Sequence, residues 1–120
     1  MDLVYSEALG LPESELGVCQ EMLRLVTQYQ QERDCRDYTG AVKTCFSLLR
    51  LNTMEPRVKQ SAIVGHLAVA FYNSGNLTEA ARYAEMGLEL SLGFHTVNHR
   101  LVLQTILNEA ESQANKGAKV

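Results

Sequence analysis

Histidines and cysteines are the residues of this chain with the widest chemical range. His95 and His99 are four residues apart, so on a helix they would project from one face and could share a metal ion. Zinc sites normally take three or four protein ligands, and no third histidine or nearby cysteine accompanies the pair. We therefore interpret the two as a solvated pair near a helix start and expect no metal site and no cofactor.

A catalytic pair of Cys35 with a histidine lacks its usual surroundings. The sequence has no glycine-rich oxyanion loop and no nucleophile elbow. It also has no phosphate-binding loop and no dinucleotide fingerprint. Cys45 lies on the apolar side of its segment and is expected to pack as a small hydrophobe. We expect His66 at the surface or in a groove. The sequence therefore predicts no catalytic residues and a protein that is not an enzyme.

Composition narrows the range of partners. The chain has 120 residues, 46% of them hydrophobic and 21% charged, which suits one domain or a short stack of helical hairpins. A net charge of −3 disfavours nucleic acid and anionic membranes as partners. No apolar run approaches the roughly 20 residues of a membrane span, and the first residues do not resemble a secretory signal. Three cysteines fit free thiols, so we expect a cytoplasmic location.

Apolar residues recur at helical spacing along most of the chain, and no useful length alternates with the period of a strand. The fold class predicted is all-α. A densely charged stretch, 31–37, is interpreted as a connection, and Pro56 and Gly93 end helices. We expect an N-terminal extension (1–12), a helical domain (13–114) and a frayed C-terminal tail (115–120), with helices over about 13–33, 38–51, 57–73, 77–91 and 96–114.

The clearest local signal is a turn around Gly75. Glycine accepts the left-handed backbone that ends a helix, and Asn76 or Thr78 can cap the next one. Ala80 then lets the two helices approach closely. These residues predict a helical hairpin.

The turn is repeated once. Residues 37–43 align without gaps with residues 76–82, and each stretch has a capping residue, a threonine and an alanine at the same offsets. The two alanines, Ala41 and Ala80, are 39 residues apart. An internal helical repeat follows from this match.

The second hairpin resembles the tetratricopeptide repeat (TPR) family, whose period is about 34 residues. The match lies in a leucine–small pair, an aromatic residue, the turn glycine and the small residue of the second helix, namely Leu67, Ala68, Phe71, Gly75 and Ala80. Ala84, Gly87 and Leu92 depart from the pattern, and the resemblance covers residues 37–92. It implies a short TPR-like stack of about five antiparallel helices, made of two hairpins and a capping helix.

The same resemblance implies a site. TPR-like stacks bind peptides or helices on the concave face formed by their first helices. Carried over to this sequence, that face holds Ala62, Gly65, Val69, Tyr72, Asn73, His99, Arg100 and Leu103, together with Thr96. Small residues here can form an apolar channel for a partner's side chains. The alternative is that the last helix covers this face as a lid and the small residues only permit close packing.

The function expected from these residues is a protein–protein interaction module or adaptor that binds a partner peptide or amphipathic helix. An acidic chaperone tail is disfavoured, because Gly65, His66 and Val69 cannot grip a carboxylate. One alternative is a dedicated small chaperone, similar to those of type III secretion, that guards a partner helix. Another is a helical nucleic-acid-binding protein such as a viral silencing suppressor. A short stack exposes apolar ends, so either the terminal helices cap it or it forms a homodimer.

Overall fold

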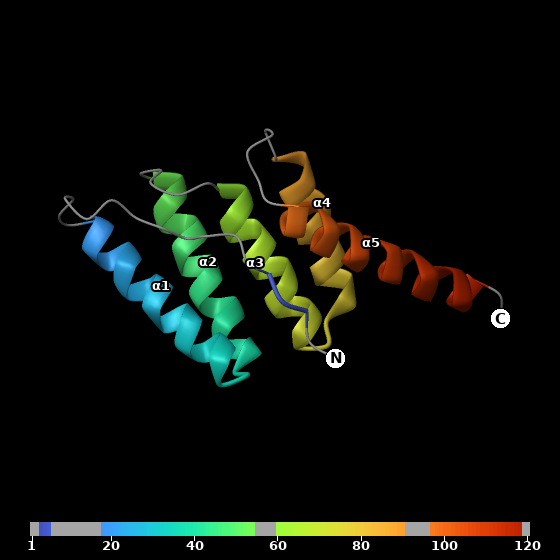
Figure 1. Ribbon diagram of the computed structural model, residues 1–120, viewed down its shortest axis with the longest axis horizontal. Coiled ribbons are helices and arrows are strands. Elements are labelled where there is room, and N and C mark those ends of the chain that lie inside the picture. Colours follow the sequence, from blue (N-terminus) through green and yellow to red (C-terminus); the bar gives the residue numbers. More distant parts are fainter. Residues whose placement is uncertain (1–2, 6–17, 55–59, 91–96, 119–120) are drawn as a thin grey trace.

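The computed structural model describes residues 3–5, 18–54, 60–90 and 97–118 of the chain. Within these ranges the backbone is helical apart from short turns and residues 3–5, and it contains no strand. The all-α prediction is therefore confirmed. The helices, coloured along the chain in Figure 1, are α1 (Val18–Asp34), α2 (Tyr38–Met54), α3 (Gln60–Asn73), α4 (Leu77–Glu89) and α5 (Val97–Ala118).

Each helix packs on the next one in sequence, and α3 also packs on α5. This order of contacts is that of an all-α stack and is compatible with a helical repeat. The molecule measures 56 × 31 × 22 Å. Its long axis arises partly from α5, whose C-terminal half projects beyond the other helices (Figure 1). None of the helices in the described ranges combines the length and apolar character required to cross a bilayer.

Helix α3 is the centre of the molecule. Every residue from 61 to 70 is buried, because this helix is apolar or small on nearly all sides and has neighbours on both flanks. One flank joins α1 and α2 in a first core, with Met22, Tyr29, Cys45, Leu48, Ile63 and Leu67 among its members. The other joins α4 and α5 in a second core that includes Tyr5, Val69, Ala80, Ala84, Leu103 and Ile106. As predicted, Cys45 packs as a core residue.

The turn between α3 and α4 has the geometry that its sequence predicts. Gly75 has a φ of 94°, and the Asn76 amide donates to the Phe71 carbonyl at 2.9 Å while the Gly75 amide donates to Tyr72 at 3.0 Å. These two bonds satisfy carbonyls that the end of α3 leaves open. The Asn76 side chain then accepts from the Glu79 amide at 3.2 Å and caps α4.

The turn between α1 and α2 repeats this arrangement. Arg36, with a φ of 61°, takes the place of Gly75, and the Asp37 amide donates to the Glu32 carbonyl at 2.8 Å. The Asp37 carboxylate accepts from the Gly40 amide at 3.1 Å. The internal repeat seen in the sequence is therefore a repeat of one turn and one cap, with arginine tolerating the left-handed position that glycine occupies in the second copy.

Several helix ends differ from the prediction; α2, for example, continues through Met54 and not only to about residue 51. The charged stretch 31–37 was expected to be a connection, but α1 continues through Asp34, because glutamine, glutamate and arginine are good helix formers on an exposed face. Helix α5 continues through Ala118, past the start of the tail expected at residue 115. The start of the first helix expected near residue 13 lies outside the described residues.

Candidate functional site

Residues 3–5 lie against the face shared by α3 and α5. We call residues 3–5 the N-terminal segment. It belongs to the N-terminal extension expected over residues 1–12, and it contacts side chains of both helices. Figure 1 shows it as the short blue stretch running along α3.

Two asparagines hold the main chain of this segment. The Leu3 amide donates to Asn73 Oδ1 at 2.9 Å, and Asn73 Nδ2 donates to the Leu3 carbonyl at 3.2 Å. From α5, Asn98 Nδ2 donates to the Val4 carbonyl at 3.3 Å. All three bonds recognise backbone atoms, so they do not depend on which side chains the segment carries.

Side chains of the segment alternate between the helices and solvent. Leu3 packs against the second core, Val4 is 75% exposed, and Tyr5 is 4% exposed. An alternation with a period of two is typical of an extended backbone. The α3–α5 face therefore holds residues 3–5 with Tyr5 directed inward and Val4 outward, an arrangement that suits an extended backbone.

Tyr5 is held in a recess between the two helices. Its hydroxyl shares a hydrogen bond with His99 Nδ1, and its ring meets His66 edge-on with the ring centroids 4.6 Å apart. A Cβ atom at Gly65 would overlap the Tyr5 hydroxyl and ring. Gly65 is therefore the residue that makes room for this side chain.

His66 was expected at the surface or in a groove; it is not at the surface but lines the recess that holds Tyr5. It is 2% exposed, and its Nδ1 shares a hydrogen bond of 2.7 Å with the Tyr29 hydroxyl. Burial raises the pKa of Tyr29, so this hydroxyl keeps its proton for the pairing. Tyr29, His66, Tyr5 and His99 thus form a continuous row of rings from α1 to α5.

His99 also differs from its first interpretation as half of a solvated pair. It is 1% exposed and paired with Tyr5, and His95 lies outside the described residues. The described part of the chain contains no group of three or more metal-ligating side chains. Of the cysteines, Cys35 is exposed at the α1–α2 turn, and burial raises the pKa of the Cys45 thiol, which disfavours the reactive thiolate.

The eight residues predicted to line the groove fall into three groups. Gly65, Asn73 and His99 contact the N-terminal segment. Ala62, Val69 and Leu103 are buried among helices, with Leu103 directed at α4: a Cβ at Gly87 would lie 2.9 Å from its Cδ1. Tyr72 and Arg100 remain at the edge.

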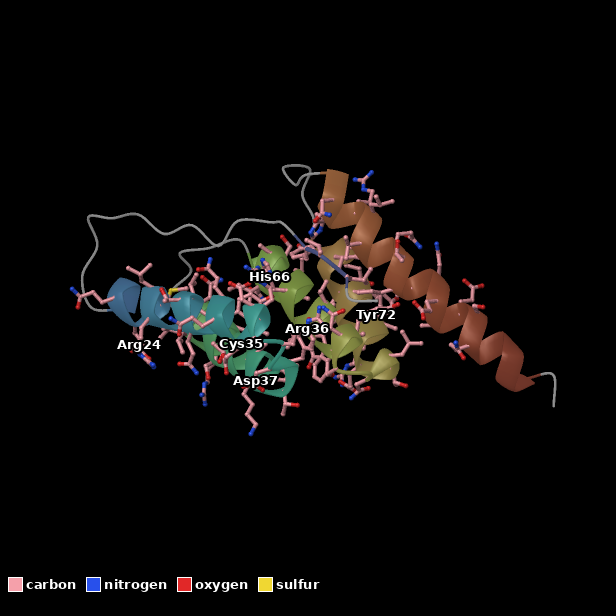
Figure 2. All side chains as sticks on the ribbon, turned by 60° about the horizontal axis from the view of Figure 1, so that its bottom comes forward. Arg24, Cys35, Arg36, Asp37, His66 and Tyr72 are labelled. Carbon is pink, nitrogen blue, oxygen red and sulfur yellow. The ribbon has the colours of Figure 1, made fainter. Side chains whose placement is uncertain are left out.

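Arg100 is exposed, and Tyr72 is half-buried beside α5 (Figure 2). The Tyr72 hydroxyl donates to the Glu109 carboxylate, and this bond raises the pKa of Tyr72. Helix α5 is thus tied to α3 at this point, which agrees in part with the alternative of a last helix that packs over the face. Thr96 lies outside the described residues.

Sequence reasoning missed Asn98 and the N-terminal segment itself, and it did not predict the contact between His66 and Tyr5. Leu3 and Tyr5 gave one signal, an apolar stretch before the break at Gly10 and Pro12. Nothing in the sequence pairs that stretch with Gly65. Comparison of the chain with protein-family models, with curated proteins and with solved structures gives no match. The geometry of the α3–α5 face is therefore the basis for inferring a function.

Proposed function

We propose that this chain is a non-enzymatic protein-interaction module, and that its α3–α5 face binds an extended segment of a partner protein. One observation carries the proposal: that face already accommodates the backbone of residues 3–5 through hydrogen bonds to Asn73 and Asn98. Main-chain bonds of this kind supply affinity for any chain that adopts the same conformation, and adjoining recesses supply the selection of side chains.

The resemblance to TPR proteins supports the same site. The repeated turn at Arg36 and Gly75 gives two hairpins of one design, α1–α2 and α3–α4, with α5 following as a further first helix. In a TPR-like stack the ligand face is formed by the first helices, which here are α1, α3 and α5. The N-terminal segment lies on two of these three.

A catalytic role has little to support it in the described residues. Both buried histidines are engaged with tyrosines, and the Cys45 thiol is held in its protonated form. Asparagine side chains that hydrogen-bond to the backbone of another segment are suited to binding a polypeptide. The proposal therefore assigns Asn73, Asn98 and the recess at Gly65 to recognition of a polypeptide.

A peptide selection tests this proposal. A random peptide library is panned on the immobilised full-length protein and, in parallel, on a Leu3→Pro variant, which lacks the amide that donates to Asn73. Enriched peptides should bind at least about five-fold more weakly to Asn73→Ala, which loses two hydrogen bonds, and equally well to Asn108→Ala, an exposed asparagine elsewhere on α5. Failure to enrich any peptide on either protein, or enriched peptides that ignore Asn73, would contradict the proposal.

A further inference from the structure

We infer that the N-terminal segment is an internal ligand of the α3–α5 face, and that the partner segment displacing it carries the same pattern: an apolar residue, any residue, then an unmodified tyrosine. This inference rests on the proposed function and specifies its ligand. The pattern follows from what the helices contact in the segment and from what they leave exposed.

The face selects weakly for the side chain at the first position of the pattern and does not select for the side chain at the second. Leu3 is partly buried against the second core, which favours an apolar side chain there. Val4 points to solvent and contributes only its carbonyl, which accepts from Asn98. Any residue that permits an extended backbone fits the second position.

The face selects strongly for the side chain at the third position of the pattern. The recess at Gly65 is shaped for a ring, His66 meets that ring edge-on, and His99 Nδ1 pairs with the hydroxyl. Phenylalanine fills the same space but leaves this hydrogen bond unmade. A phosphorylated tyrosine would place a dianion where the hydroxyl is buried against α3 and α5. The site therefore selects tyrosine over both.

Tethering makes the internal ligand a strong competitor. Because the segment belongs to the same chain as the face, it competes at an effective concentration on the order of millimolar. A free peptide of similar intrinsic affinity binds only the fraction of molecules whose own segment is detached, and its apparent affinity falls by that fraction. Loosening the N-terminal segment should therefore expose the partner site without altering it.

The test measures binding of a synthetic peptide of residues 1–7, with a fluorophore at its C-terminal end, to the full-length protein by fluorescence anisotropy. Leu3→Pro loosens the segment and leaves every helix side chain in place, so its dissociation constant should be at least about ten-fold lower than that of the wild type. Tyr5→Ala, which removes the side chain from the recess, should lower the dissociation constant of the peptide to a similar extent. Adding Gly65→Ala to Leu3→Pro should abolish binding, because the new methyl group fills the recess. Adding Glu85→Ala, on the exposed side of α4, should change nothing.

Peptide variants test the pattern itself on the Leu3→Pro protein. Valine to alanine at the second position should change the dissociation constant by less than about two-fold, and tyrosine to phenylalanine should weaken binding about five-fold. The phosphotyrosine peptide should not bind.

Three outcomes overturn the inference. If folded Leu3→Pro protein binds no peptide, the segment is only a structural part of the core. If peptides selected from the library depend on Asn73 but lack the pattern, the inference fails while the proposed function stands. If light scattering shows a dimer that the peptide dissociates, the occupant is the segment of a second copy and not a partner. Should Tyr5→Ala fail to fold, the Leu3→Pro result decides alone.

Discussion

At the scale of single residues, the molecule is organised around tyrosine–histidine pairs. Tyr29 with His66 and Tyr5 with His99 each bury an imidazole beside a phenol, and a buried polar group is stable only when it is hydrogen-bonded. The partners are 37 and 94 residues apart in sequence. Sequence reasoning found the caps, which are local, but did not predict that His66 and His99 are buried, because their burial depends on tyrosines brought in by distant elements.

Removing one hydroxyl from this row should be costly. Tyr29→Phe keeps the ring but leaves His66 Nδ1 without the bond to Tyr29, so we expect the free energy of unfolding to fall by about 1–3 kcal/mol. Tyr83→Phe, at a half-buried position on α4, is the control and should change it by less than about 0.5 kcal/mol. Urea denaturation measures both. Equal stabilities for the two variants would show that the pairing contributes nothing.

Alkaline pH should also destabilise the fold, because the buried Cys45 thiol and the buried Tyr29 hydroxyl resist losing their protons. Burial raises the pKa of Cys45 and of Tyr29, so the unfolded state releases these protons first as the pH rises. The contribution of these two groups to the free energy of unfolding should be constant below about pH 8.5. It should fall by up to about 1.4 kcal/mol per pH unit above about 8.5 for Cys45, the ordinary pKa of a thiol, and above about 10 for Tyr29, the ordinary pKa of a phenol.

Urea denaturation between pH 7 and 10 measures this dependence. Cys45→Ala removes the thiol, so its stability should decline less steeply between about pH 8.5 and 10 than that of the wild type. Parallel profiles for the two proteins would mean that the Cys45 thiol is not protected in the folded state.

At the scale of elements, local signals set the helices and their turns. Gly75 and Asn76 specify where α3 ends and α4 begins through bonds that span only a few residues, which is why the sequence alone located this turn. The ends of α1 and α5 were harder to place, because charged and polar residues suit an exposed helix as well as a loop. Helix existence was therefore predictable from periodicity, and helix length was not.

The left-handed position of Gly75 gives a sharp test of the turn. A Cβ there would meet no atom within 4 Å, so any cost of substitution comes from the backbone alone. Gly75→Ala should lower the free energy of unfolding by about 1–2 kcal/mol. Gly75→Asn should cost less, because asparagine tolerates this conformation. Thermal and urea denaturation distinguish the two, and an Ala variant as stable as the wild type would contradict the assigned turn.

The contact between α3 and α4 is tested by overpacking. Ala80 is completely buried in the second core, and Ala80→Leu should cost about 1–3 kcal/mol of stability. Glu85→Leu adds the same side chain to the exposed face of α4 and serves as the control. If both variants unfold at the same urea concentration, α3 and α4 do not pack closely at Ala80.

At the scale of the whole molecule, one central helix belongs to two cores and to the proposed binding face. Helix α3 packs on α2 and α4 and, together with α5, holds the N-terminal segment. Sequence reasoning placed Gly65, Asn73 and His99 on one face through the resemblance to TPR proteins. It did not find what lies on that face, because the fit of Tyr5 to Gly65 exists only after the chain has folded.

In the proposed function, the α3–α5 face is a site for an extended tyrosine-containing segment, and residues 3–5 occupy it. The most direct measurement is the ratio of the dissociation constants of the peptide of residues 1–7 for wild-type and Leu3→Pro protein. We predict that the variant binds the peptide at least about ten-fold more tightly, and that Gly65→Ala removes this binding. Equal dissociation constants, or no binding to the folded variant, would contradict the claim.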